Sequence, residues 1–284
     1  MAIITFWNNG KEETGQTMSV IAMASVMAIE HNLKILVVET SFDDKTLELA
    51  YGGQDKNKAI IKSIIKDASK ASIDNGIDGL IKNAYSGRLT PEIIPSYTGI
   101  VYKNRLEILY GVKNIEREIS KVQYEKTRAK YKDIILNASK YYDMVIVDLD
   151  RHINDEVTQQ ILEMSNIIIY NTEQKIDTIN AFIQLRKEQP FFARANVMLN
   201  IGKFDKHSKY NEANVIRYTG IKKDVLNVPY NTLYFEAARE EKVADLFLRA
   251  RKISDSDKNA LFINAVNKDV ERIIYKLQEL QMKM

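Results

Sequence analysis

Residues 10–17 read GKEETGQT and place two glycines, a lysine and a threonine in one short loop. An apolar run, IITFW at 3–7, precedes the loop, and a helix-like run, MSVIAMASVMAIE, follows it. Such loops bind phosphate because successive backbone N–H groups and the positive end of a helix converge on the anion. In the standard pattern a lysine follows the second glycine and reaches the phosphates, and a Ser or Thr binds Mg²⁺. Here Gln16 replaces that lysine and Thr17 supplies the hydroxyl.

The elements that must position this loop are short β-branched runs separated by helix-length segments. Consecutive apolar positions in such runs favour a parallel sheet that is covered on both faces. The sequence therefore predicts an α/β fold of the P-loop NTPase type, with a mostly parallel sheet of seven or eight strands and helices on both faces. The predicted strands lie at 3–7, 34–39, 106–111, 144–149, 166–171, 196–200 and 225–229.

Helical patterns fill the intervals between these runs. The clearest is a helix at 16–31, which together with the strands on either side predicts a βαβ crossover. The interval at about 44–105 contains several Gly and Pro breakers and predicts a helical insertion at the edge of the sheet. A charged helix is expected at 114–141, and a last amphipathic helix at about 258–283. We expect one domain over 1–284, because no repeat or Pro/Ser-rich linker interrupts the pattern.

The composition excludes several classes of protein. The chain has 284 residues, 45% of them hydrophobic, which suffices for a substantial core. It has no cysteine, which excludes disulfides, zinc ribbons and thiol catalysis. The apolar runs are too short to cross a bilayer, and the N-terminal residues do not read as a secretory leader. We therefore expect a cytoplasmic protein.

The ordered motifs resemble those of the ParA/MinD family of ATPases. GKEETGQT resembles the family's deviant phosphate loop, GKGGxGKT, and Lys11 occupies the place of its signature lysine. ILVVETS resembles VLLVDxD, with Glu39 at the first aspartate, and YYDMVIVDLD resembles YDYIIIDTP, with Asp148 at the strand end. VMLN resembles the strand that ends in the family's adenine-side asparagine, here Asn200, and LNVPYN resembles the proline segment beside the base, here Pro229.

This resemblance extends over residues 3 to about 250 and implies an ATP-sandwich homodimer that binds ATP or ADP with Mg²⁺. It implies that Lys11 of one subunit reaches the phosphates of the other, and that Thr17 and Asp148 hold the metal. It assigns catalytic roles to Lys11 and Glu39. The residues that it implies for nucleotide binding are Gly10, Lys11, Thr14, Gly15, Gln16, Thr17, Asn200 and Pro229, together with the backbone N–H groups of 12–17.

Several residues depart from the family pattern. Gln16 removes a positive charge from the phosphates, and Glu12 and Glu13 stand where the family has glycines. Glu39 extends its carboxylate by one methylene, and Ser41 loses a charge. Two hypotheses stay open. One is a nucleotide-dependent dimerising switch that positions DNA or a cellular assembly with weak or absent ATP hydrolysis. The other is a non-enzymatic pseudo-ATPase, a constitutive dimer or localisation adaptor in partition, conjugation or pilus assembly.

Two basic segments are candidates for contacts with DNA, because Lys and Arg neutralise phosphate charge. They are YEKTRAKYKD at 124–133 and LFLRARK, which contains Arg249, Arg251 and Lys252. A solvated helix face is the simpler interpretation of the first. The family touches DNA non-specifically near its C-terminal region, so the resemblance favours the second. A partner protein is a further expectation.

The remaining signals have simpler interpretations. His31, His152 and His207 lie in unrelated contexts without the spacing of a metal site. The last helix mixes acidic residues with lysines on its polar face, whereas a helix that lies on a membrane favours Lys and Arg there. We therefore expect it to pack on the domain or on a dimer partner.

Overall fold

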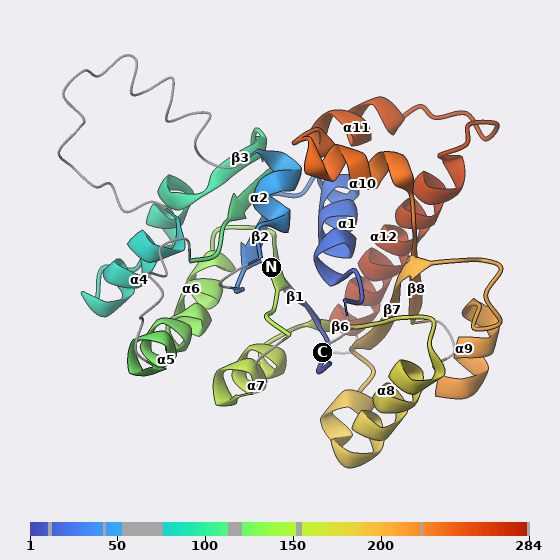
Figure 1. Cartoon of the computed structure of the whole chain (residues 1–284). Helices are drawn as coiled ribbons and strands as arrows, with labels where there is room; N and C mark the ends of the chain where they lie inside the picture. Colours follow the sequence, from blue (N-terminus) through green and yellow to red (C-terminus); the bar gives the residue numbers. More distant parts are fainter. Residues whose placement is uncertain are drawn as a thin grey trace.

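The computed structural model describes residues 1–10, 13–41, 44–52, 76–112, 121–151, 155–221 and 224–282. Within them, an eight-stranded sheet confirms the predicted α/β fold class (Figure 1). All seven predicted runs form strands: β1 (Ala2–Trp7), β2 (Ile35–Glu39), β4 (Leu106–Leu109), β5 (Met144–Asp148), β6 (Ile167–Thr172), β7 (Val197–Phe204) and β8 (Val225–Pro229). Their residues are almost all buried, as expected of strands covered on both faces.

The strand order is β3-β4-β2-β5-β1-β6-β7-β8, and every pair is parallel except β3 with β4. β1 therefore lies in the middle of the sheet, between β5 and β6. The register aligns Phe6 of β1 and Glu39 of β2 with Asp148 of β5. Because parallel strands end at the same edge, the loop after β1 and the ends of β2 and β5 meet there.

The eighth strand, β3 (Gly99–Tyr102), lies in an interval for which helices were predicted. The described part of 44–105 contains α2 (Thr46–Tyr51), α4 (Ile77–Tyr85), the 3-10 segment η2 (Pro91–Tyr97) and then β3. β3 pairs antiparallel with β4 and forms one edge of the sheet. This part of the chain thus adds a strand as well as helices.

Helices cover both faces of the sheet, and two hydrophobic clusters fill the space beneath them. One face carries α1 (Gln16–Glu30), α2, α10 (Thr232–Arg239), α11 (Val243–Ala250) and α12 (Ala260–Gln281). The other carries α4, α6 (Tyr131–Ala138), α7 (Glu156–Glu163), α8 (Ile176–Glu188), the 3-10 segment η3 (Pro190–Ala193) and α9 (Glu212–Thr219). Figure 1 shows α1 beside the C-terminal helices, which come from the opposite end of the sequence.

The single helix predicted at 114–141 is two helices in the described residues. α5 (Lys121–Ala129) ends one residue before Lys130, and α6 begins one residue after it, at Tyr131. The Lys130 N–H bonds to the carbonyl of Thr127, three residues back, which closes α5 with a tight turn. Residues 113–120 of the predicted helix lie outside the described residues.

The last helix, α12, packs on α1 and β8. Its apolar stripe, which includes Val266, Val270 and Ile273, is buried in the same cluster as the α1 side chains. The expectation that this helix packs on the domain is confirmed. Within the described part of the chain, no helix combines the length and the apolar character needed to cross a membrane.

Candidate functional site

The first turn of α1 faces the edge of the sheet where β1, β2 and β5 end. Gly15 precedes this turn with φ 73°, a left-handed conformation that glycine adopts without steric cost. No side chain caps the helix, and its first turn has no acidic residue. Among the described residues, no side chain therefore caps the N-terminal amides of α1, and the positive end of its dipole favours an anion.

The end of β7 contacts this loop. A Cβ atom added to Gly202 would lie 2.0 Å from the Thr14 carbonyl oxygen, so only glycine fits there. A Cβ added to Gly15 would lie 3.3 Å from Cγ of Lys203. Gly202 and Lys203 were not predicted as site residues. A glycine at a strand end is a weak signal, since the close approach depends on the register of two distant segments.

Gln16, which replaces the expected lysine, is buried and fully engaged. Its Nε2 donates to Oδ1 of Asp148 at 2.7 Å and to the Leu149 carbonyl at 2.8 Å. Its Oε1 accepts a hydrogen bond from Nδ2 of Asn8 at 3.1 Å. Gln16 therefore links α1 to the end of β5 through hydrogen bonds from a neutral amide, where a lysine would bring a positive charge.

The side chain of Asn8 forms hydrogen bonds with three residues of the same loop and the start of α1. Its Nδ2 donates to Oγ1 of Thr14 at 3.2 Å as well as to Gln16, and its Oδ1 accepts from the Gly10 N–H at 3.0 Å. This residue also was not predicted, because an asparagine after a strand is common in turns of every kind. The sequence-predicted residues Gly10, Thr14 and Gln16 are thus brought together around one asparagine.

The two residues predicted for the metal, Thr17 and Asp148, lie close together. Burial raises the pKa of Asp148 to about 6, while hydrogen bonds with Gln16 and Thr17 favour its ionised form. The Thr17 hydroxyl also lies 3.4 Å from Oδ2 of Asp44. Among the described residues no group of three His, Asp or Glu side chains is arranged to hold a metal. Mg²⁺ needs fewer protein ligands when water and phosphate complete its shell, so a hydroxyl and a carboxylate fit it.

Glu39 stands beside Asp148 in the next strand. Its Oε2 accepts a hydrogen bond from the Gly111 N–H at 2.9 Å, and its Oε1 has no hydrogen-bond partner among the described residues. Desolvation by burial, together with the charges of Asp148 and Asp44, raises the pKa of Glu39 to about 8, against the opposing effect of the Gly111 hydrogen bond. Glu39 is therefore protonated at neutral pH in this structure, and it shares the sheet edge with the metal candidates.

The two residues predicted for the base side lie in the strands beyond. Asn200 is fully buried, and its Nδ2 donates to Oγ of Ser19 at 2.9 Å and to Oδ1 of Asn171 at 2.8 Å. Its amide contacts protein groups in this structure, and an adenine contact stays a prediction. Pro229 ends β8 and is buried, directly before the exposed Tyr230.

Lys11 of the predicted site lies outside the described residues, and so does Glu12, whose backbone N–H was predicted to contact phosphate. Glu13 is described, and its side chain is exposed to solvent. The basic segment at 124–133 does not form one continuous phosphate-contacting face. Arg128 is buried and forms an ion pair with Asp155 at 2.9 Å, and Tyr131 is in the core.

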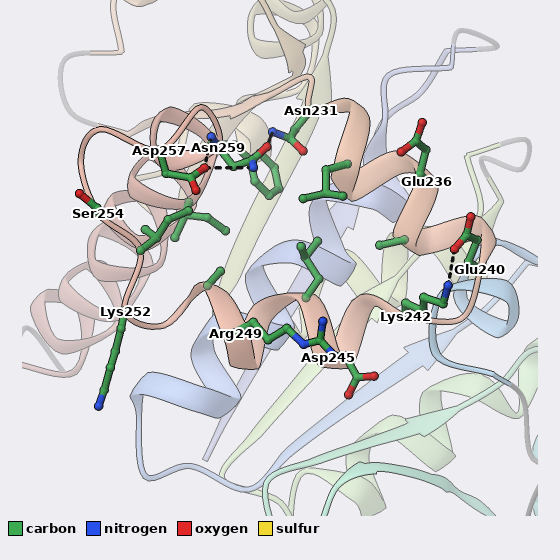
Figure 2. Close-up of a pocket in the computed structure, with 17 residues that line it drawn as sticks. Asn231, Glu236, Glu240, Lys242, Asp245, Arg249, Lys252, Ser254, Asp257 and Asn259 are labelled. Carbon is green, nitrogen blue, oxygen red and sulfur yellow. Dashed lines mark hydrogen bonds and ion pairs between the residues drawn. The ribbon is translucent and has the colours of Figure 1, made fainter.

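A cleft of about 740 Å³ lies between α10, α11 and the segment that leads into α12 (Figure 2). Its lining mixes apolar side chains with both charges: Leu233, Glu236, Lys242, Asp245, Leu246, Arg249, Lys252, Asp257 and Phe262. Of the basic residues predicted to touch DNA, Arg249 and Lys252 line this cleft, and Arg251 pairs with Glu30 at 3.0 Å. No described residue of the loop between β1 and α1 lines it.

No protein-family model matches the sequence, and no curated protein matches it significantly. Solved structures do match. A ParA family ATPase from Chlorobium tepidum is 16% identical with a TM-score of 0.64, over 97% of this chain and 98% of that one. MinD from Pyrococcus horikoshii in complex with Mg-ADP is 17% identical with a TM-score of 0.59, over 97% and 99%. A MinC:MinD complex from Aquifex aeolicus matches at 12% identity with a TM-score of 0.62, over 97% and 96%. The chain therefore has the fold of these ATPases.

Proposed function

We propose that this chain is a ParA/MinD-like switch that binds Mg-ATP or Mg-ADP, dimerises in response, and positions DNA or a cellular assembly in the cytoplasm. The observation that carries the proposal is the uncapped start of α1, held against Asp148 at the edge of the sheet. The fold of solved ParA and MinD ATPases supports it, and one of those MinD structures holds Mg-ADP.

The described residues fit the nucleotide in three ways. The amides at the start of α1 are available for phosphate oxygens, and the absence of a Cβ at Gly202 leaves room for the Thr14 carbonyl in this loop. Thr17 and Asp148 would hold magnesium, which offsets phosphate charge when it is bound. Lys11 of a second copy would act across the dimer, as the resemblance implies.

We propose that hydrolysis is weak or absent because two groups are poorly suited to it. Gln16 is neutral and occupied by Asp148, Leu149 and Asn8. In this structure the raised pKa of Glu39 favours its protonated form, and its Oε2 accepts a hydrogen bond from the Gly111 N–H. The phosphate would then lack a positive charge from residue 16, and the attacking water would lack a carboxylate that could accept its proton.

Calorimetric titration with Mg-ATP and with Mg-ADP tests nucleotide binding directly. Wild-type protein is expected to release or take up heat at sub-millimolar to millimolar nucleotide, and no heat at millimolar concentration would exclude the proposal. Gln16→Lys should tighten binding at least about tenfold, because a charge about 4 Å from phosphate is worth on the order of 4 kcal/mol at an effective dielectric near 20. Gln184→Lys makes the same change on the exposed surface of α8 and should leave the affinity unchanged.

A second candidate function is a pseudo-ATPase that serves as a constitutive dimer or localisation adaptor. The engagement of Gln16 by Asp148 favours it, because the loop is closed on the protein's own groups without any nucleotide. This function predicts an oligomeric state in light scattering that does not change with Mg-ATP. A shift from monomer to dimer on addition of Mg-ATP would exclude it and support the switch.

A further inference from the structure

The loop between β1 and α1 lacks a positive charge at residue 16. Gln16 is neutral, and its side chain is held by three protein groups, so it contributes no cation to a bound phosphate. Nucleoside polyphosphates carry several negative charges, and hydrogen bonds from charged groups to them are stronger than those from neutral groups. A positively charged side chain elsewhere beside the loop would therefore strengthen the binding of a polyphosphate.

Lys203 brings such a cation to the loop from the end of β7. Its Cγ lies 3.3 Å from the position that a Cβ on Gly15 would occupy, so its side chain lies against the residue that precedes α1. The ammonium lies three bonds beyond Cγ, which is within reach of an anion bound at the first turn. The side chain is exposed, and no described residue forms an ion pair with it.

The backbone of β7 is irregular at Lys203. The pairing of β7 with β8 shifts register between Ile201 and Phe204, which marks a bulge at Gly202 and Lys203. Lys203 has φ 52°, a conformation that Gly or Asn adopts at lower cost than Lys. Bulges of this kind redirect side chains next to functional sites. The neighbouring Gly202 lies so close to the Thr14 carbonyl that a Cβ atom would not fit between them, so the bulge and the loop are in contact.

We propose that Lys203 supplies, from β7, the positive charge that Gln16 does not supply, and that it contacts the phosphates of a bound nucleoside polyphosphate. This inference rests on the proposed function, since it requires that the loop binds nucleotide. It assigns Lys203 to phosphate binding and gives it no contact with the base.

Calorimetric titration with Mg-ADP compares wild-type protein with Lys203→Asn, Lys203→Arg and Lys206→Asn. Asn tolerates φ 52° and the position is exposed, so Lys203→Asn should fold normally. It should weaken binding at least about tenfold, while Lys203→Arg stays within about threefold of wild type. Lys206→Asn removes the same charge from an exposed residue of the following turn and should also stay within about threefold.

The outcomes separate the two claims. Binding by Lys203→Asn within about threefold of wild type would overturn the role of Lys203 and leave nucleotide binding intact. Absence of binding by wild-type protein would overturn the proposed function, and the role of Lys203 with it. In the Gln16→Lys background, Lys203→Asn should cost less than about threefold, because the restored lysine takes over the charge. If Lys203→Asn lost as much affinity in the Gln16→Lys background as in the wild-type background, the idea that Lys203 replaces the charge of a lysine at residue 16 would be contradicted.

Modification by an amine-reactive reagent gives a readout that does not depend on heat or turnover. Mass spectrometry should show that Mg-ADP slows acylation of Lys203 several-fold, while adenosine leaves it unchanged and Lys206 reacts equally in all conditions. Equal acylation of Lys203 with and without Mg-ADP, under conditions in which wild-type protein is saturated, would overturn the proposal.

Discussion

Glu39 and Asp148 lie side by side at the ends of β2 and β5, and both carboxyl groups have raised pKa values because they are buried. A lysine at residue 16 would stabilise two carboxylates at this edge of the sheet, whereas Gln16 offers only hydrogen bonds. The site therefore keeps a proton on Glu39 at neutral pH. A proton bound more tightly in the folded state makes stability depend on pH.

Glu39→Gln tests this coupling. The folded pKa of about 8 lies above the ordinary value of 4.5, so the proton on Glu39 stabilises the folded state below pH 4.5, and this contribution is lost as pH rises toward 8. Over that window wild-type protein should lose on the order of 4 kcal/mol of unfolding free energy that the variant does not lose. Urea unfolding at pH 5 and pH 8 measures the difference.

Glu13→Gln is the matched control, since it removes an exposed carboxyl group from the same loop. Its unfolding free energy should follow pH as that of wild-type protein does. Parallel pH curves for wild type and Glu39→Gln would contradict a bound proton on Glu39.

At the scale of residues, the sequence predicted which types stand at the loop but not how they pair. The order of motifs indicated Gly10, Thr14, Gln16 and Thr17 on one side and Asp148 on the other, and the structure brings all of them to one sheet edge. The bond from Gln16 to Asp148 was not predictable, because it joins residues 132 positions apart and depends on side-chain rotamers. Gly202 and Lys203 were not predictable for the same reason, and Asn8 was not predicted because an asparagine after a strand is common in turns.

At the scale of elements, the end of β7 contacts the loop between β1 and α1. Gly202 and Lys203, near its end, lie close to the Thr14 carbonyl and to Gly15, so a change in β7 can alter the first turn of α1 without a change in the sequence of α1. The element pattern itself was largely predictable, since the seven consecutive apolar runs all became strands. β3 was missed because it is short and half-exposed at the edge of the sheet. The break between α5 and α6 was missed because no glycine or proline marks it.

Gly202→Ala should disturb the loop from this strand. An added Cβ would lie 2.0 Å from a backbone carbonyl, which cannot move without shifting Thr14. We expect a loss of at least about 2 kcal/mol in unfolding free energy, as for an overpacked core, and at least tenfold weaker binding of Mg-ADP. Chemical unfolding and calorimetric titration measure the two effects.

Gly220→Ala provides the comparison. Gly220 ends α9 with φ 71° and has open space around its Cα, so the variant carries only the cost of a left-handed Ala, about 1 to 2 kcal/mol. It should lose stability but bind nucleotide as wild type does. Unchanged binding by Gly202→Ala would show that β7 does not shape the loop.

At the scale of the whole molecule, the two ends of the sequence form one core. α1 begins at the loop, and α12 packs along it and against β8. Tyr234 of α10 also donates its hydroxyl to the Met18 carbonyl at 2.6 Å, in the first turn of α1. The C-terminal helices therefore support the same turn that the proposed function needs.

Ile273→Ala tests this support. Ile273 is fully buried in α12, and a truncation of this size in a core costs about 2 to 5 kcal/mol. Tyr275→Ala, two residues on, changes a side chain that is 68% exposed and should alter stability by less than about 0.5 kcal/mol. Thermal and chemical unfolding of both variants measures the contrast, and equal losses would mean that α12 is not part of the common core.

The bond from Gln16 to Asp148 has a consequence for how a ligand enters. Because Asn8, Gln16 and Asp148 already fix the start of α1 in the free protein, this turn has little conformational freedom left to lose on binding. A ligand that fits the turn as it stands should associate quickly and with a small change in backbone order. A ligand that binds the Asp148 carboxylate must first displace the side-chain amide of Gln16, and its association should be slow.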